Sequence, residues 1–265
     1  MKTFYYVHTG HRIGLDRFRR AAAIVNSLGD VDITLLCSDF RIAQIAKDFG
    51  IKNSVGVDVV RNIPQISHHG DQIVFDSDEA NPIMLEDMKN YFSTFIHIKA
   101  DDVMIDKKYF QKTPKHIKIA FFYGDDDYEK DMQKYIPALK KLDAEILLGF
   151  YYFLDYEDML KREFVKHYEF EEYDEVIKGS EILITSSPQA VLECLASGGK
   201  PIYLQRDDYT QDFQNLFKNM NIPIVKTLDL GQITPIIETI ESYGYYELQH
   251  KSKKLSELIK ENLNL

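Results

Sequence analysis

Hydrophobic residues follow two different periods along the chain, and stretches of the two kinds alternate. Short apolar runs such as Thr3–Val7 and Ile182–Ile184 are typical of strands that are buried on both faces. The longer stretch Asp16–Leu28 instead has apolar residues every three or four positions, as one buried face of a helix requires. Alternation of such strands and helices predicts an α/β protein with parallel sheets.

The first half of the chain is predicted to have the order β-α-β-α-β. Beyond the strand Thr3–Val7 and the helix that follows it, we expect strands at 32–37, 54–57 and 94–98 and helices at 41–49 and 84–92. Residues 61–81 are punctuated by Pro64 and Gly70 and are followed by Pro82, so this stretch is predicted to be irregular.

A polar segment containing Pro114, residues 109–115, predicts the boundary between two halves. After it the apolar strand His116–Tyr123 ends at a glycine, and the alternation starts again. The other elements expected here are strands at 145–150, 182–184, 201–204 and 222–226 and helices at 128–142 (kinked or divided at Pro137), 157–165, 173–178, 188–197, 211–220, 234–243 and 246–262. We therefore expect two domains, 1–113 and 114–265.

The composition excludes several classes of function. The chain has 265 residues, with 42 acidic against 32 basic side chains and a formal charge of −10. This charge repels phosphate backbones, so we do not expect a nucleic-acid-binding protein. No apolar run is long enough to cross a bilayer, and the first residues enter a strand rather than a signal peptide. The two cysteines, Cys37 and Cys194, lie in or beside apolar elements, which favours reduced thiols and a cytoplasmic location.

The stretch 181–212 is predicted to form a β-turn-α-β unit that holds a ligand. Ser186 or Ser187 can cap the helix that starts at Pro188, and a second strand follows and ends before Gln205. In a parallel sheet the ligand lies outside the carboxyl ends of the strands. These ends carry Ser186 and Ser187 on one strand and Gln205 on the next, so we expect these side chains to contact the ligand.

The loop after the first strand is a second candidate site. Gly10 and Gly14 allow the backbone to turn sharply and to approach a ligand, although the full G-x-G-x-x-G pattern of a dinucleotide fold is missing. His8 and His11 lie in this loop, and histidine is the side chain best suited to proton transfer near neutral pH. Either histidine is a candidate base, with a polar loop residue as the alternative.

Basic side chains gather on the helix after this loop. Arg17 and Arg20 lie on its first turns, where they can neutralise a diphosphate or an anionic acceptor. The alternative is a solvated helix face. Because the chain as a whole is acidic, the cluster favours an anionic ligand.

Two metal-site hypotheses are weaker. Asp76 and Asp78 form an Asp-x-Asp pattern after an apolar run, and such a pair can hold a divalent cation on a nucleotide diphosphate. A solvated acidic turn is the alternative. His68 and His69 have no third ligand at a recognisable spacing, so a zinc site is not expected.

The stretch 181–212 resembles the donor-binding segment of GT-B nucleotide-sugar enzymes. The resemblance rests on a strand, a small-residue turn, a helix with Glu193 in its middle, then Ala-Ser-Gly-Gly-Lys-Pro and a second apolar strand. It implies two Rossmann-like domains whose parallel sheets face a central cleft. It also implies that Glu193 receives the ribose hydroxyls of UDP and that Gln211, at the place of the family's Asn-Gln or Asp-Gln pair, contacts the sugar.

The same resemblance implies roles for two other parts of the chain. Gly124 would belong to a glycine-rich turn near the donor phosphates, and the last helix would cross back to the first domain. The sequence departs from the family pattern at Asp125–Asp127, where a second glycine and hydroxyl residues are usual. Three carboxylates there would repel a diphosphate, so we expect them to cap the following helix.

Within GT-B enzymes, the chain is most similar to the UDP-sugar hydrolases of pseudaminic (nonulosonic) acid biosynthesis. Their first loop has the form Ile-Gly-x-Gly-His-x-x-Arg, and Ile13, Gly14 and Arg20 match it. Arg17, however, stands in the place of the catalytic histidine, and an arginine does not act as a base near neutral pH. Either His11 or His8 takes over the proton transfer, or the reaction is lost.

The resemblance therefore implies a glycosyltransferase or UDP-sugar hydrolase of surface-glycan or nonulosonic acid biosynthesis. The first domain would supply the base and bind the acceptor, and the second would bind the nucleotide sugar. No cofactor and no metal are expected, because helix amino termini and basic side chains can stabilise the leaving diphosphate. The alternative is an accessory protein that binds a nucleotide sugar without turnover. The sequence predicts no oligomeric state.

Overall fold

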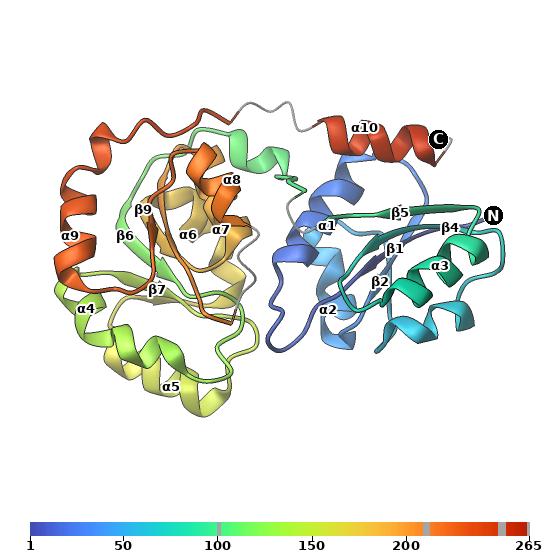
Figure 1. Ribbon diagram of the computed structural model, residues 1–265. Helices are drawn as coiled ribbons and strands as arrows, with labels where there is room; N and C mark the ends of the chain where they lie inside the picture. Colours follow the sequence, from blue (N-terminus) through green and yellow to red (C-terminus); the bar gives the residue numbers. More distant parts are fainter. Residues whose placement is uncertain (100–101, 209–212, 249–252, 264–265) are drawn as a thin grey trace. The chain divides into compact units, whose positions relative to one another are not determined.

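The computed structural model describes residues 1–99, 102–208, 213–248 and 253–263. These residues fold into two compact units, whose elements are labelled in Figure 1. Unit 1 contains the described residues up to Asp106 together with the C-terminal helix, and unit 2 contains those from Lys107 to Leu248. Each unit is built around its own sheet.

The sheet of unit 1 has five parallel strands in the order β3-β2-β1-β4-β5. The strands are β1 (Thr3–Val7), β2 (Ile33–Cys37), β3 (Asn53–Gly56), β4 (Gln72–Asp76) and β5 (Thr94–His97). The helices are α1 (Asp16–Ser27), α2 (Phe40–Ile45), α3 (Pro82–Tyr91) and α10 (Lys253–Asn262), with the 3-10 helices η1 (Ala46–Phe49) and η2 (Val60–Gln65). Helix α10 packs against α1 and β5.

The prediction that residues 61–81 are irregular is wrong, because this stretch contains β4, the neighbour of β1 in the sheet. Only three apolar residues separate Gln72 from Asp76, yet both polar residues are buried. Gln72 donates to the carbonyl of Leu263 at 3.2 Å, and Asp76 pairs with Arg20. The partners that make this stretch a central strand lie far away in the sequence, where a local pattern does not record them.

The sheet of unit 2 has six parallel strands in the order β11-β10-β9-β6-β7-β8. The strands are β6 (Ile117–Phe122), β7 (Glu145–Leu147), β8 (His167–Tyr168), β9 (Ser180–Thr185), β10 (Lys200–Leu204) and β11 (Ile224–Val225). The α-helices are α4 (Ile136–Lys141), α5 (Leu154–Glu163), α6 (Tyr173–Gly179), α7 (Pro188–Ala196), α8 (Phe213–Asn219) and α9 (Leu230–Glu238). The 3-10 helices are η3 (Lys107–Phe110), η4 (Asp131–Tyr135), η5 (Phe170–Glu172) and η6 (Ile240–Ser242).

Several elements of unit 2 differ from their predicted extents. The helix predicted for 128–142 is divided into η4 and α4 beside Pro137, as the proline suggested. The short strand β8 was not predicted. The helix predicted for 246–262 does not include Tyr246, whose amide donates to the carbonyl of Met220, and its described part is α10 (Lys253–Asn262) of unit 1. No helix in the described ranges is long and apolar enough to cross a membrane.

The two sheets confirm the predicted α/β class and its two Rossmann-like halves. In each sheet the strand order reverses at one place, where the chain leaves one edge and returns on the other side of the first strand. In unit 1 this place lies between β1 and β4, and we call their carboxyl ends switch point 1. In unit 2 it lies between β6 and β9, and we call their carboxyl ends switch point 2. Ligands of open α/β sheets bind at such points.

Alternating residues of the central strands build the hydrophobic cores. In unit 1, Phe4 and Tyr6 of β1 and Phe75 of β4 belong to one buried cluster, and the rings of Tyr6 and Phe75 stack at 5.4 Å. In unit 2, Phe121 of β6 and Ile184 of β9 belong to another. Burial on this scale holds the strand ends, and with them the residues of both switch points, in place.

Candidate functional site

The loop between β1 and α1 turns back on itself at switch point 1. The amides of Ile13 and Gly14 donate to the carbonyl of Gly10 at 3.1 and 2.9 Å, which closes a tight turn. Gly10 and Gly14 have φ values of 145° and 73°, and Arg12 between them has 68°. Positive φ favours glycine, which explains the two glycines of the loop. The His8 amide donates to the Asp76 carbonyl at 3.1 Å and ties the loop to β4.

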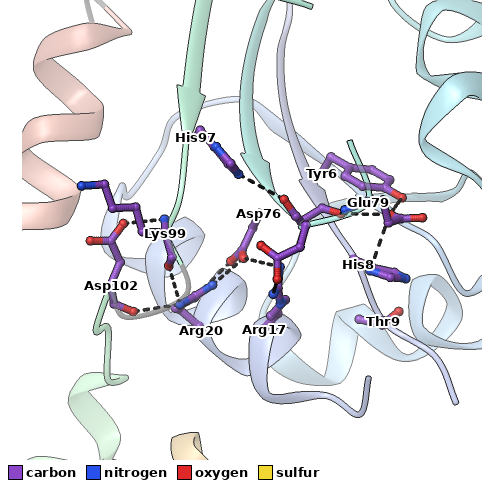
Figure 2. A network of polar contacts seen from close by, with 12 residues as sticks. Tyr6, His8, Thr9, Arg17, Arg20, Asp76, Glu79, His97, Lys99 and Asp102 are labelled. Atoms are coloured by element: carbon purple, nitrogen blue, oxygen red, sulfur yellow. Dashed lines mark hydrogen bonds and ion pairs between the residues drawn. The ribbon is translucent and has the colours of Figure 1, made fainter. Parts of the chain in front are cut away.

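A buried ion pair joins Arg20 of α1 to Asp76 at the end of β4, as Figure 2 shows. Asp76 at the end of β4 is fully buried, and its carboxylate accepts from Arg20 Nε at 3.1 Å and Nη2 at 2.5 Å. Tyr5 also donates to Asp76, at 3.0 Å, and Arg20 Nη1 donates to the carbonyls of Lys99 and Asp102. Burial alone would lower the pKa of Arg20, but the Asp76 charge and hydrogen bonds raise it. Arg20 is therefore a permanent cation inside unit 1.

The basic cluster on α1 is paired with carboxylates. Besides the Arg20 pair, Arg17 Nη2 bonds to Asp78, and Arg17 Nη1 lies 3.9 Å from Asp76. Arg19 lies 3.9 Å from Asp16 on the same helix. Carboxylates thus lie beside Arg17, Arg19 and Arg20, and the contact of the cluster with an anionic ligand stays a prediction.

His8 faces a carboxylate held in a fixed position. Its Nδ1 lies 3.7 Å from Glu79 Oε2, the oxygen that also accepts from the Tyr6 hydroxyl at 2.5 Å and from Ser77 Oγ at 3.0 Å. Burial lowers the pKa of His8, and Arg17 lowers it further, whereas Glu79 acts in the opposite direction. The imidazole is therefore biased toward its neutral form, which is the form that accepts a proton.

The other predicted base, His11, lies elsewhere in the same loop. It is exposed, whereas His8 is partly buried. The structure thus places His8, Arg17 and Arg20 together at switch point 1 and leaves His11 at the surface, with Gly14 buried at the start of α1.

Several buried polar atoms at the switch points have no hydrogen-bond partner among the described residues. They are Thr9 Oγ1 and Arg17 Nη1 at switch point 1 and Ser186 Oγ at switch point 2. Thr9 is 4% exposed and Ser186 is fully buried. Buried polar groups are nearly always satisfied in folded proteins, so a water or a ligand atom can complete the bonding at these positions.

At switch point 2 the turn from β9 into α7 is closed by hydroxyl groups. Thr185 Oγ1 accepts from the Ser187 amide at 3.0 Å, and Ser187 Oγ accepts from the Ala190 amide at 3.0 Å. Ser187 is therefore the helix cap, with Pro188 at the first helical position, and Ser186 is not needed for capping. The N-terminus of α7, with its partial positive charge, lies at the ligand edge of the sheet.

The turn after β6 forms the other side of switch point 2. Gly124 has a φ of 123°, and Asp127 accepts from the amides of Asp131 at 2.7 Å and Met132 at 3.0 Å as well as from the Tyr156 hydroxyl. The expectation that the aspartates cap the next helix is confirmed for Asp127. Burial raises the pKa of Asp127, although these hydrogen bonds oppose the rise.

Glu193 in the middle of α7 is buried and bonded on both oxygens. It accepts from the Tyr173 hydroxyl at 2.7 Å and from Gln189 Nε2 at 2.9 Å, and it is 1% exposed. Glu193 is thus not a solvated helix residue, since it joins α6 to α7. Gln205 is also buried, and its Nε2 donates to the Arg206 carbonyl at 2.9 Å. Gln211 lies outside the described residues.

The Asp-x-Asp carboxylates are occupied by arginines. Asp76 is paired with Arg20 and Asp78 with Arg17, so neither points its charge toward an empty cation position. Within the described ranges, no three His, Cys, Asp or Glu side chains gather in a way that could hold a metal ion. Both cysteines are buried and free.

Sequence reasoning missed the residues that surround His8. Glu79, Ser77 and Tyr6 are the main ones, together with Thr9. One signal was present, since an acidic run directly after an apolar stretch is what a strand end at a polar site looks like. The Asp-x-Asp spacing of this run also matches a metal pattern, but the pairing of β4 with β1 places Glu79 beside His8.

No protein-family model matches the sequence, and no curated protein resembles it in sequence. Solved structures do resemble it in fold. The UDP-GlcNAc 2-epimerase of Methanocaldococcus jannaschii, solved with UDP-GlcNAc and UDP, matches with a TM-score of 0.63 and 11% identity over 100% of this chain and 99% of its own. HepE of Anabaena, solved with UDP and glucose, matches with a TM-score of 0.62 and 11% identity over 100% of this chain and 99% of its own.

MurG of Acinetobacter baumannii matches with a TM-score of 0.56 and 11% identity, over 98% of this chain and 100% of its own. These are GT-B structures with two Rossmann-like domains, and the similarity runs through both units. The chain therefore has the GT-B fold.

Proposed function

We propose that the protein binds a nucleotide sugar, with UDP as the nucleotide, and transfers or hydrolyses its sugar. The observation that carries this proposal is that both Rossmann-like units place buried polar groups, some without partners, at their switch points. The similarity to structures solved with UDP or UDP-sugars supports the choice of nucleotide.

In this proposal His8 is the general base. With Nδ1 turned toward Glu79, the Nε2 lone pair of the neutral ring accepts the proton of a water or an acceptor hydroxyl. The oxygen of that nucleophile forms a bond to the anomeric carbon as the bond from this carbon to the diphosphate breaks. The electron pair leaves with UDP, and Glu79 stabilises the imidazolium that results.

Unit 2 binds the nucleotide at switch point 2. The N-terminus of α7 and Ser186 Oγ contact the diphosphate, and Gly124 allows the backbone after β6 to approach it. By resemblance, Glu193 contacts the ribose and Gln211 the sugar. Gln205, which follows the carboxyl end of β10, contacts the same ligand. A ribose bond to Glu193 would be shared with those from Tyr173 and Gln189.

In unit 1, Arg20 holds Asp76 in position, and the Asp76 carbonyl accepts from the His8 amide. The Nη2 of Arg17 is bound to Asp78, whereas its Nη1 has no hydrogen-bond partner among the described residues. In this proposal Nη1 contacts the substrate. The hydrolase reaction, the role in surface-glycan or nonulosonic acid biosynthesis and the cytoplasmic location belong to this proposal as well.

Thermal unfolding with a panel of nucleotides tests the proposal. UDP and UDP-sugars are expected to raise the Tm. A ligand at 100 times its Kd stabilises the folded protein by about 2.7 kcal/mol. ADP and GDP should raise the Tm less. Each ligand is tested with manganese and with a chelator. If Asp76 and Asp78 bound the ligand through a metal, the ligand would raise the Tm only in the presence of manganese. If no nucleotide stabilises the protein, the proposal is wrong.

A second candidate is a binding protein without turnover. It is favoured by Arg17, which stands at the place of the catalytic histidine of the hydrolases that the chain resembles and is bound to Asp78. Mass spectrometry of each UDP-sugar after incubation separates the two candidates. Free UDP appears only if His8 or another base acts, whereas the binding protein returns the donor intact at any enzyme concentration.

A further inference from the structure

Arg206 follows β10, and its side chain extends across switch point 2. Its Nη1 donates to the carbonyl of Asp126 at 2.6 Å, and Asp126 follows β6. In the sheet, β9 lies between β10 and β6. The Arg206 side chain must therefore pass over the carboxyl end of β9, which continues into Ser186 and Ser187.

The guanidinium of Arg206 is held more firmly than the carboxylate that pairs with it. The guanidinium lies over the Tyr123 ring at 4.4 Å, and only 4% of the Arg206 side chain is exposed. Its Nε and Nη2 donate to the two carboxylate oxygens of Asp208 at 2.8 and 2.6 Å. The side chain of Asp208 is 53% exposed. The cation is fixed in the protein, whereas its carboxylate partner lies at the surface.

This paired geometry also suits a phosphate. Two parallel N–H donors of a guanidinium match two oxygens of a carboxylate or of a phosphate equally well, and a phosphate carries more charge. Because the Asp208 side chain is exposed to solvent, exchanging it for a ligand oxygen costs little. Ser186 Oγ, fully buried and without a hydrogen-bond partner in the described chain, is a second donor at the same strand end.

The acidic turn beside it does not prevent this exchange. Asp127 directs its oxygens to the amides of Asp131 and Met132 and to Tyr156, and Asp126 Oδ2 accepts from the Tyr128 amide at 3.3 Å. Arg206 contacts the Asp126 backbone carbonyl, which keeps the guanidinium at the turn whichever anion it binds.

We propose that Arg206 binds a phosphate of the nucleotide diphosphate, and that Asp208 occupies the guanidinium until the ligand displaces it. The proposal rests on the nucleotide-sugar function above and adds its phosphate ligand. Asp208 then acts as a built-in competitor that weakens binding of the nucleotide.

Calorimetric titration of UDP and of inorganic pyrophosphate tests the competitor. Asp208→Asn is expected to bind both about 3- to 10-fold more tightly than the wild-type protein, because the competing charge is removed. Asp207→Asn is the matched control, since it removes the same charge from an exposed neighbour. Its affinity should stay within about twofold of the wild type. Equal affinities of the two variants, or weaker binding by Asp208→Asn, would overturn the proposal.

The arginine itself is tested with Arg206→Gln. This variant should bind UDP at least about tenfold more weakly, as expected for loss of a buried charge-assisted contact, while its affinity for uridine stays unchanged. Circular dichroism and the Tm show whether the variant is folded. If it is not, the Asp208→Asn comparison still decides.

The outcomes also separate this proposal from the function on which it rests. If neither Asp208→Asn nor Arg206→Gln changes the affinity for UDP, the Arg206 assignment is wrong, but the nucleotide-sugar function is still supported. Pyrophosphate binding that strengthens in Asp208→Asn, without any binding of UDP, upholds an anion site and rejects the nucleotide. Binding of neither ligand by the wild type and by Asp208→Asn rejects both.

Discussion

At switch point 1 the buried carboxylate of Asp76 is neutralised by an arginine side chain, whereas at switch point 2 Asp127 accepts backbone amides and a tyrosine hydroxyl. The strand topology around the two points is the same. The difference shows how one fold supports two tasks. Paired side chains fix the charge around a titratable histidine, whereas amides and hydroxyls at a helix N-terminus leave donors for a phosphate.

The largest expected effect concerns the ion pair of switch point 1. Arg20→Met leaves Asp76 charged and buried without its cation, which should lower the free energy of unfolding by about 3–5 kcal/mol. Urea denaturation measures it. Arg41→Met is the control, because Arg41 pairs with Asp39 at the surface and its loss should cost about 0–1 kcal/mol.

A double variant sharpens this test. Adding Asp76→Asn to Arg20→Met removes the uncompensated charge and should restore part of the stability. A loss for Arg20→Met no larger than that for Arg41→Met would mean that the buried pair does not stabilise switch point 1.

The next effect concerns the base. His8→Asn should lower kcat by about 100- to 10,000-fold, because no other side chain takes up the proton, while the Kd for UDP stays nearly constant. Turnover of a UDP-sugar and UDP titration measure the two quantities. His11→Asn serves as the control and should retain activity, since His11 is exposed. The opposite result for the two histidines would move the base to the loop tip.

A smaller effect separates the two serines of switch point 2. Ser187→Ala removes the cap of α7 and should cost about 1 kcal/mol of stability by urea denaturation. Ser186→Ala should cost much less, because Ser186 Oγ has no hydrogen-bond partner in the described chain, but it should weaken UDP binding. If Ser186→Ala binds UDP as well as the wild type does, the hydroxyl does not contact the nucleotide.

The smallest effect is a shift in titration. Since burial lowers the pKa of His8, NMR of its ring should show protonation below the ordinary value of about 6.5. A lowered pKa in the folded state means that His8 adds stability above its unfolded pKa and loses it as the pH falls through the folded pKa. Glu79→Gln should lower the pKa further, because the carboxylate raises it. A rise in this variant would contradict the pairing of His8 with Glu79.

Local features of the sequence were sufficient for much of the architecture. The Ser187 cap joins residues only three positions apart, and the glycine turn after β1 closes within five residues, so both can be recognised from neighbouring letters. The alternation of buried strands and amphipathic helices likewise predicted the α/β class and the two sheets. The α/β class required no more than these periods, whereas β4 and β8 did not follow from them.

The chemistry of switch point 1 required the tertiary structure. Arg20 and Asp76 are 56 positions apart, and Tyr6 and Glu79 are 73 apart. They meet because β4 pairs with β1 rather than with β3, the strand directly before it in the chain. The sequence by itself determined most of the strands and helices, since these depend on neighbours, but not β4, whose buried polar ends have distant partners. The sheet order decided which charges meet, because pairing between distant segments is chosen by the packing of the whole unit.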